Sequence, residues 1–315
     1  MKKNFFNLIG ILGILFLAAG CSQKENIAQS GENKLTVTTT IFTPYDFVRQ
    51  IAGDRVNLSM LLPPGAESHS FEPSPRDIIT VQNSRLFIYA GGESDEWINS
   101  ILESMDTQNM EILPLMDCVD VVEEEIVEGM EEEEEEEEGI AYDEHVWTSP
   151  KNAVRIVRAI TEALCALDAA NADFYQQNSA AYIAELEALD VEFQAVAGSA
   201  KRKTIIFGDR FPFRYFADAY GLSYYAAFPG CSTETECSAA TVAFLIDKMK
   251  AEKVPVVFHI ELSNEKIADT IAEATGAKKL LLHACHNVSK NDFENGASYV
   301  SLMRGNVGNL REALN

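Results

Sequence analysis

The sequence predicts an α/β protein of two lobes, each with a mostly parallel sheet flanked by helices. Short β-branched or apolar segments alternate with helical segments along both halves of the chain, a pattern typical of parallel strands joined by helical crossovers. Between the halves, a nearly glycine-free helical segment runs from Asn171 to about Ala197. At 1.5 Å per residue it is on the order of 40 Å long, which suits a strut between two lobes.

Each half contains four strand patterns. In the first half they lie at Leu35–Ile41, Val56–Leu62, Leu86–Ala90 and Glu111–Leu115. In the second half they lie at Lys203–Phe207, Tyr224–Phe228, Pro255–Ile260 and Lys279–His283. Helical spacing separates them at Tyr45–Ala52, Pro75–Asn83, Glu96–Ser104, Lys151–Asp168, Phe211–Tyr220, Ala239–Glu252, Asn264–Thr275 and Tyr299–Leu314. Ser74, Ser149 and Ser238 are the expected helix caps.

The N-terminus has the pattern of a bacterial lipoprotein signal. Lys2 and Lys3 precede an apolar stretch that ends in Leu-Ala-Ala-Gly before Cys21. We therefore expect a signal peptide over residues 1–20, with Cys21 as the lipid anchor, and a polar spacer over 21–34. The expected fold then comprises an N-terminal lobe (35–170, with an acidic loop at 120–142), a linking helix (171–199) and a C-terminal lobe (200–315).

The net charge excludes a nucleic-acid-binding protein. It is −24 for the whole chain, and removal of Lys2 and Lys3 with the signal changes it to −26. Such a charge suits a protein that handles cations outside the cytoplasm. Export also permits disulfides. Besides Cys21, five cysteines remain, which is an odd number.

An acidic stretch leads to the most distinctive histidine. Twelve glutamates lie between Glu123 and Glu138, eight of them consecutive, and Asp143-Glu144-His145-Val146-Trp147 follows. One interpretation is that the stretch gathers cations and His145 belongs to a fixed site. The other is a solvated surface loop, with His145 capping the next helix.

The five histidines cluster near predicted strand ends and loops. Because loops at the carboxyl ends of parallel strands converge, His69, His145 and His283 can meet between the lobes. Imidazole nitrogens with a carboxylate suit zinc best. His259, within an apolar strand, is expected in the core or behind a ligand. Asp209, in the loop after a strand, is either a site residue or part of a salt bridge that braces the lobe.

Catalytic motifs are absent from the sequence. It contains no GxSxG elbow, P-loop, HExxH or dinucleotide-binding fingerprint. A zinc hydrolase would need a general base, and the only candidates are Glu67 and Glu261, neither of which lies in a recognised motif. We therefore expect no enzymatic activity.

Five segments together resemble the zinc/manganese-binding solute-binding lipoproteins of metal ABC importers. The segments are GAESHSFEPSP (Gly65–Pro75), DEHVWTSP (Asp143–Pro150), RYFADAYGL (Arg214–Leu222), IADTIAEATGAK (Ile267–Lys278) and YVSLMRGNVGNLREAL (Tyr299–Leu314). The resemblance implies two lobes with four-stranded sheets, joined by one long rigid helix, with the metal between them. It carries family ligands over to His69 and His145.

The chain departs from that family pattern in three places. The acidic loop contains no histidine, Arg210 stands near the position of a third ligand, and His283 replaces a late carboxylate. An arginine keeps its proton and cannot ligate. The ligand set inferred from the resemblance is therefore His69, His145 and His283, completed by His286 or Asp209. Arg210 is then expected to pair with Asp209 or with a nearby acid such as Glu261.

A disulfide is expected in the second lobe. Cys231 and Cys285 both follow predicted strands, and their pairing would fix the loop that carries His283 and His286. Cys231 with Cys237, and Cys118 with Cys165, are the alternatives.

These observations together predict a monomeric receptor, anchored by lipid on the outer face of the cytoplasmic membrane. It would capture Zn²⁺ between its lobes and deliver it to an ABC transporter permease. A manganese receptor and a metal-containing adhesin lipoprotein are the alternatives, but manganese sites favour carboxylates over histidines.

Overall fold

The computed structural model of the protein describes residues 34–67, 71–130, 141–232 and 236–315. The predicted signal peptide, Cys21 and the predicted spacer up to residue 33 lie outside the described residues, as does His69.

The first sheet has four parallel strands in the order β2-β1-β3-β4. They are β1 (Leu35–Thr39), β2 (Val56–Met60), β3 (Leu86–Tyr89) and β4 (Glu111–Pro114). The helices between them are α1 (Phe42–Ala52), α2 (Pro75–Gln82) and α3 (Glu96–Glu103). Val37 on β1 and Ile88 on β3 are fully buried, since both central strands are covered on two sides.

The second sheet repeats this topology, with four parallel strands in the order β6-β5-β7-β8. They are β5 (Thr204–Phe207), β6 (Ser223–Tyr225), β7 (Val256–His259) and β8 (Lys278–Leu281). The helices that follow these strands are α6 (Arg214–Tyr220), α7 (Ala239–Glu252), α8 (Lys266–Thr275), α9 (Lys290–Glu294) and α10 (Tyr299–Leu314). The predicted α/β fold of two four-stranded lobes is confirmed.

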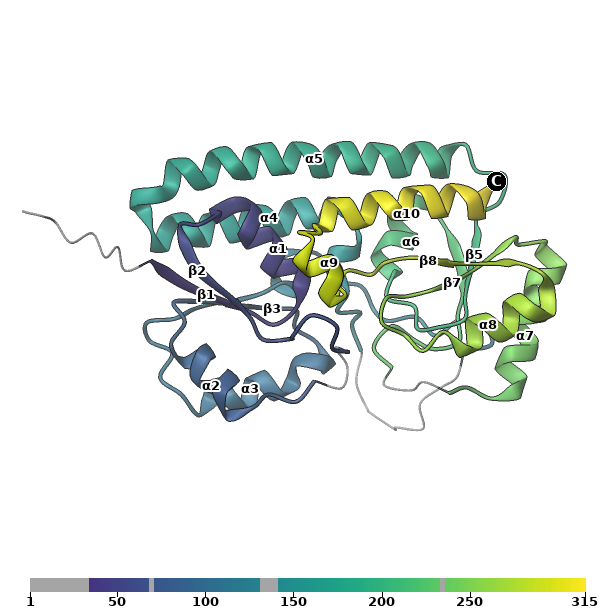
Figure 1. Cartoon of the computed structure of the whole chain (residues 1–315), viewed down its shortest axis with the longest axis horizontal. Coiled ribbons are helices and arrows are strands. Elements are labelled where there is room, and N and C mark those ends of the chain that lie inside the picture. Colours follow the sequence, from purple (N-terminus) through teal and green to yellow (C-terminus); the bar gives the residue numbers. More distant parts are fainter. Residues whose placement is uncertain (1–33, 68–70, 131–140, 233–235) are drawn as a thin grey trace, which may run out of the picture. The chain divides into compact units, whose positions relative to one another are not determined.

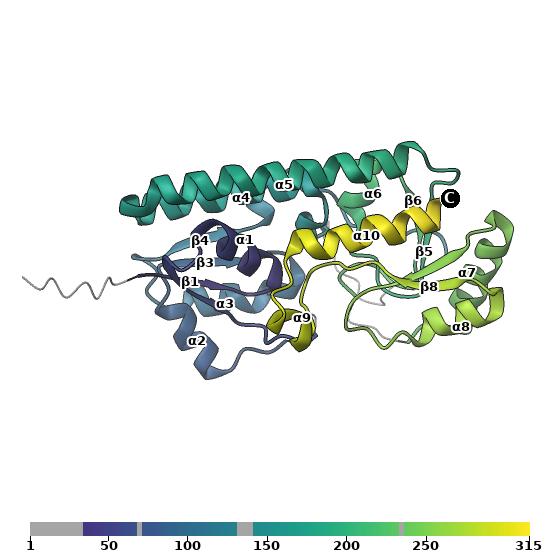
Figure 2. The ribbon, with the colours of Figure 1, turned by 45° about the horizontal axis from the view of Figure 1, so that its top comes forward.

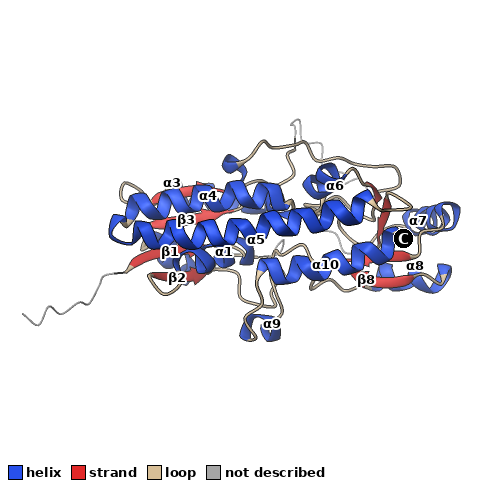
Figure 3. Cartoon of the chain, turned by 90° about the horizontal axis from the view of Figure 1, so that it is seen from above, coloured by secondary structure: helices blue, strands red, loops and turns tan. Residues whose placement is uncertain are grey.

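Long helices join the lobes. The 27-residue helix α5 (Ala172–Gly198) lies beside α4 (Pro150–Leu167) in the first lobe and beside α10 in the second (Figures 1–3). Leu186, Leu189 and Phe193 recur at helical spacing on its buried face. The predicted long linking helix is thus confirmed. Among the described residues, no helix is both long enough and apolar enough to pass through a bilayer.

Local signals explain several helix starts. Ser74 caps α2 in a capping box with Asp77, and Ser238 accepts a hydrogen bond from the Thr241 N–H at the start of α7. Ser149 makes no such bond, so α4 begins on Pro150 alone. Helix α9 was not predicted from the sequence. It has only five residues, too few for a periodic pattern, and Ser289 caps it.

The predicted disulfide is wrong. Cys231 and Cys285 carry free thiols, which also excludes the Cys231–Cys237 alternative, and Cys118 and Cys165 are free as well. Cys285 lies fully buried in a tight turn with φ of 64°, and its thiol approaches the His283 carbonyl. Burial raises the pKa of both the Cys285 and Cys231 thiols well above the ordinary value. Two loops that follow strands of one sheet need not bring their side chains together, and here each thiol has its own buried surroundings.

A buried carboxylate ties the first lobe to the long helices. Asp46 on α1 is fully buried, and its Oδ1 accepts bonds from Arg49 at 3.0 and 2.5 Å. Its Oδ2 accepts the backbone N–H of Tyr299, the first residue of α10, at 2.7 Å and the Tyr182 hydroxyl of α5 at 3.4 Å. One side chain therefore connects α1, α5 and α10.

We expect Asp46→Ala to lower the free energy of unfolding by about 2–4 kcal/mol, because it leaves buried donors without an acceptor. Urea denaturation followed by circular dichroism measures this. Asp54→Ala is the matched control, since the Asp54 side chain is 91% exposed. Equal stability of the two variants would contradict the role of Asp46.

Candidate metal centre

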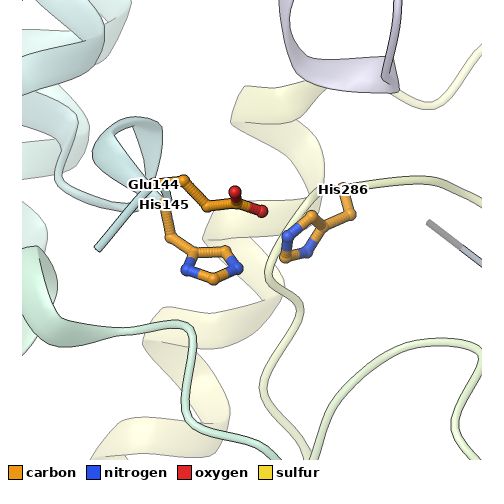
Figure 4. A group of neighbouring side chains, drawn as sticks. All are labelled: Glu144, His145 and His286. Atoms are coloured by element: carbon orange, nitrogen blue, oxygen red, sulfur yellow. The ribbon is translucent and has the colours of Figure 1, made fainter. Parts of the chain in front are cut away.

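Three side chains able to bind a metal meet between the lobes. One ligand atom from each of Glu144, His145 and His286 lies within 4.8 Å of the others (Figure 4). Their residues are 2%, 0% and 6% exposed, respectively. Glu144 and His145 precede α4 in the first lobe, whereas His286 lies in the loop after β8 in the second lobe. The site therefore draws on both halves of the chain.

Asp143 fixes the orientation of His145. Its Oδ1 accepts the backbone N–H of His145 at 2.7 Å and lies 2.9 Å from the ring Nδ1. With Nδ1–H donated to this carboxylate, Nε2 carries the lone pair that a metal needs. Trp147 packs at 5.6 Å from the His145 ring and donates its indole N–H to the Ala284 carbonyl at 2.8 Å.

Glu144 reaches the same site because the chain turns at His145. The backbone there has φ of −81° and ψ of 42°, and a 3-10 turn over Val146–Thr148 follows. The Glu144 carboxylate accepts the Ser94 N–H at 3.1 Å. It lies against Gly92, where an added Cβ would come within 2.7 Å of Glu144 Oε2. A glycine at position 92 therefore makes room for this carboxylate.

The loop 283–288 carries His286 and is bonded to both lobes. On the second-lobe side, Glu261 accepts the backbone N–H groups of Ala284 at 2.7 Å and His286 at 2.9 Å. On the first-lobe side, the Phe42 N–H bonds the His286 carbonyl and the Gly65 N–H bonds the Val288 carbonyl, each at 2.8 Å. The Asn287 amide adds bonds to the Pro63 and Ala66 carbonyls, each at 2.8 Å. His286 is thus held where the lobes meet.

Ring packing completes the position of His286. Its ring centroid lies 4.6 Å from that of His145 and 5.0 Å from that of Trp147, both edge to face. The Nε2 atoms of both histidines are buried.

Burial and neighbouring charges shift the pKa values of the groups in the site. Burial lowers the pKa of His145, but Asp143, Glu144 and Glu124 raise it more, so the net shift is upward. Burial raises the pKa of Glu144. Burial and the neighbouring Glu144 raise the pKa of Asp95 from 3.8 to about 7. This concentration of buried acid around two imidazoles favours a bound cation.

A protein-family model described as the periplasmic component A of the zinc-uptake complex, ZnuA, matches residues 37–313. The chain belongs to this family. The high-affinity zinc uptake system protein ZnuA of Bacillus subtilis is 34% identical over 317 residues, covering 100% of this chain and 99% of that protein. The zinc-binding lipoprotein AdcA of Streptococcus pneumoniae is 30% identical, but the chain spans only 61% of its length.

A solved structure of the ZnuA family supports the same fold. The crystal structure of the Zn(II)-bound ZnuA-like domain of Streptococcus pneumoniae AdcA superposes with a TM-score of 0.74 at 27% identity. The match covers 89% of this chain and 99% of that one.

Within this ZnuA-family fold, the other predicted site residues have different surroundings. His283 is not among the three clustered residues; its Nδ1 accepts the Cys285 N–H at 3.0 Å and lies 3.4 Å from Glu261 Oε2. Asp209 accepts the backbone N–H groups of Arg210 at 2.9 Å and Ile260 at 3.2 Å, joining the ends of β5 and β7. The His259 Nδ1 lies 3.0 Å from the Ile260 carbonyl.

Arg210 pairs with a nearby acid, as predicted, but this acid is neither of the two that were named. Its guanidinium bonds Glu67 at 3.1 Å rather than the side chain of Asp209 or Glu261. Both of those carboxylates already accept backbone N–H groups, whereas Glu67 comes from the facing loop of the first lobe. The position near a family ligand is thus occupied by an ion pair between lobes.

Glu144 is a candidate ligand that was not predicted from the sequence. It was quoted within the Asp143–Trp147 motif, but adjacent residues usually point to opposite sides of an extended chain. The signal was present, since a carboxylate beside a candidate ligand can reach the same site wherever the chain turns.

Asp95→Asn tests the acidity of this region in the metal-free protein. Because the folded pKa of about 7 exceeds the ordinary 3.8, folded Asp95 holds a proton that the unfolded chain has released between these values. Stability therefore falls as pH rises through this window. We expect the variant to gain about 1–3 kcal/mol over the parent between pH 4 and pH 8.

Urea denaturation across that pH range measures the difference. Asp106→Asn, at an exposed carboxylate, is the control and should show no such trend. A stability difference for Asp95→Asn that stays constant with pH would contradict the assignment.

Proposed function

We propose that this chain is an extracytoplasmic zinc receptor, anchored by lipid on Cys21, that delivers Zn²⁺ to the permease of an ABC importer. The observation that carries the proposal is the buried cluster of Glu144, His145 and His286 in a member of a zinc-uptake family. His69 remains a predicted fourth ligand and lies outside the described residues.

The donor set favours zinc. Two imidazoles and one carboxylate are ligands that Zn²⁺ takes in tetrahedral sites, whereas manganese sites favour more oxygen ligands. In this proposal His283 and Glu261 support the loop, and Asp143 orients His145. Such supporting residues tune metal sites nearly as strongly as the ligands themselves.

The same contacts count against a zinc hydrolase. Glu261 accepts two backbone N–H groups, and Glu67 is paired with Arg210. Neither carboxylate is therefore placed to act as a general base on a metal-bound water.

Capture and release follow from how the site is held. Because the loop 283–288 bonds both lobes, the ligands are close together before the ion arrives. Binding then needs small movements of side chains, and release to the permease would come from a local shift of this loop rather than from wide separation of the lobes.

We expect His145→Ala and His286→Ala each to weaken zinc binding at least 100-fold, because each removes one of few ligands. Isothermal titration calorimetry on metal-stripped protein gives the affinity. His259→Ala is the control, since this imidazole lies outside the cluster and should leave affinity within about threefold. Unchanged affinity in both cluster variants would overturn the proposed site.

Deletion of Glu131–Glu138 should slow zinc capture and leave equilibrium affinity nearly unchanged, because the run attracts cations by long-range charge. Met130 is buried and must be retained. Stopped-flow association at low and high salt measures capture, and salt should shrink the difference from the parent. A large loss of equilibrium affinity would instead make the run part of the site.

A further inference from the structure

One glutamate of the acidic stretch lies in a different environment from its neighbours. Glu123 and Glu125 are exposed, whereas Glu124 is partly buried between the lobes. The chain forms an antiparallel bridge between Glu123 and Tyr142, with the Glu124 N–H bonded to the Ala141 carbonyl at 2.9 Å. This pairing directs the Glu124 side chain toward the second lobe.

The Glu124 carboxylate binds the backbone of a second-lobe loop. Its Oε1 accepts the Cys231 N–H at 3.1 Å. This charge-assisted bond fixes the loop between β6 and α7 against the first lobe.

That loop presses against the ring of His145. A Cβ added at Gly230 would lie 3.0 Å from His145 Cε1 and 3.1 Å from Nδ1, as well as 3.0 Å from the Phe211 carbonyl. Glycine is therefore the residue that lets the backbone approach the imidazole so closely. The ring is confined by Gly230, by Asp143 at Nδ1 and by the rings of Trp147 and His286.

We propose that Glu124 is a positioning residue of the metal site, which braces the Gly230–Cys231 backbone against His145 so that Nε2 faces the bound ion. This inference rests on the proposed zinc-binding function and deepens it. It divides the acidic stretch, because Glu124 acts through its reach and hydrogen bonds, whereas the run Glu131–Glu138 is expected to act through its charge.

Two substitutions at this position separate reach from charge. Glu124→Gln keeps the length and an acceptor oxygen but removes the charge. Glu124→Asp keeps the charge but shortens the side chain by one methylene, which withdraws the carboxylate from the Cys231 N–H. If Glu124 acts by bracing, Glu124→Gln should bind zinc as the parent does and Glu124→Asp should bind it more weakly. If Glu124 acts by charge, the reverse is expected.

The experiment titrates full-length, metal-stripped protein with Zn²⁺, using calorimetry and the fluorescence of Trp147 beside the site. We expect Glu124→Asp to weaken binding about tenfold and Glu124→Gln to stay within about threefold of the parent. Gly230→Ala should also weaken binding about tenfold or more, because its methyl group displaces the His145 ring. Glu123→Asp and Glu123→Gln, at an exposed neighbour, are the matched controls and should match the parent.

Thermal unfolding of the metal-free variants distinguishes positioning from general stability, since bracing predicts weaker zinc binding by Glu124→Asp with an unfolding midpoint close to that of the parent. Parent-like affinity in Glu124→Asp, or an affinity of Glu124→Gln as low as that of Glu124→Asp, would overturn the inference. A parent protein that binds no zinc would instead refute the proposed function.

Discussion

The candidate site depends on the hydrogen bonds that the Glu261 carboxylate accepts from the backbone N–H groups of Ala284 and His286. Without them the second lobe would still hold the start of the loop 283–288, where the Asn306 side chain of α10 bonds the His283 backbone, but His286 would lose its fixed relation to His145. The same loop bonds α1, the segment after β2 and the indole of Trp147. A short irregular segment is therefore as well determined as a strand, because nearly every polar group that it buries has a partner in one lobe or the other.

The fold was predictable from sequence because its signals are local and repeated. Strands and helices alternate in both halves of the chain, and the apolar positions of α5 recur at helical spacing along its length. The site was predictable only in part. His145 was named as a ligand and His286 as one of two alternatives to complete the site, whereas His283 lies outside the cluster. Glu144 was missed, since its direction depends on the turn at His145. The ion pair of Arg210 with Glu67 depends on which loops face each other across the lobes, and the free thiols of Cys231 and Cys285 depend on how two loops of one lobe direct their side chains. Sequence spacing within one lobe carries little information about that.

Charge has two uses in the chain, separated by burial. The run Glu131–Glu138 is expected to act over a distance and to be screened by salt. Buried carboxylates act by contact: Asp143 orients a ring, Asp46 joins three helices and Glu261 holds a loop. The net charge of −24 therefore includes both acids that act over a distance and buried acids that act by contact. Their contributions respond differently to ionic strength, since a buried hydrogen-bonded pair is shielded far less than an exposed one.

The span of α5 across both lobes has an energetic consequence for a receptor. A protein that must first adopt a rare closed state binds its ligand more weakly by the fraction of molecules in that state. Here α5 and α10 lie along the lobes, and Asp46 fixes the start of α10 to α1, so the binding-competent arrangement is the ground state. The intrinsic affinity of the ligands is then expressed almost in full. In the proposed function, the free energy for releasing the ion would come from the permease, through contacts that favour a strained form of the loop 283–288.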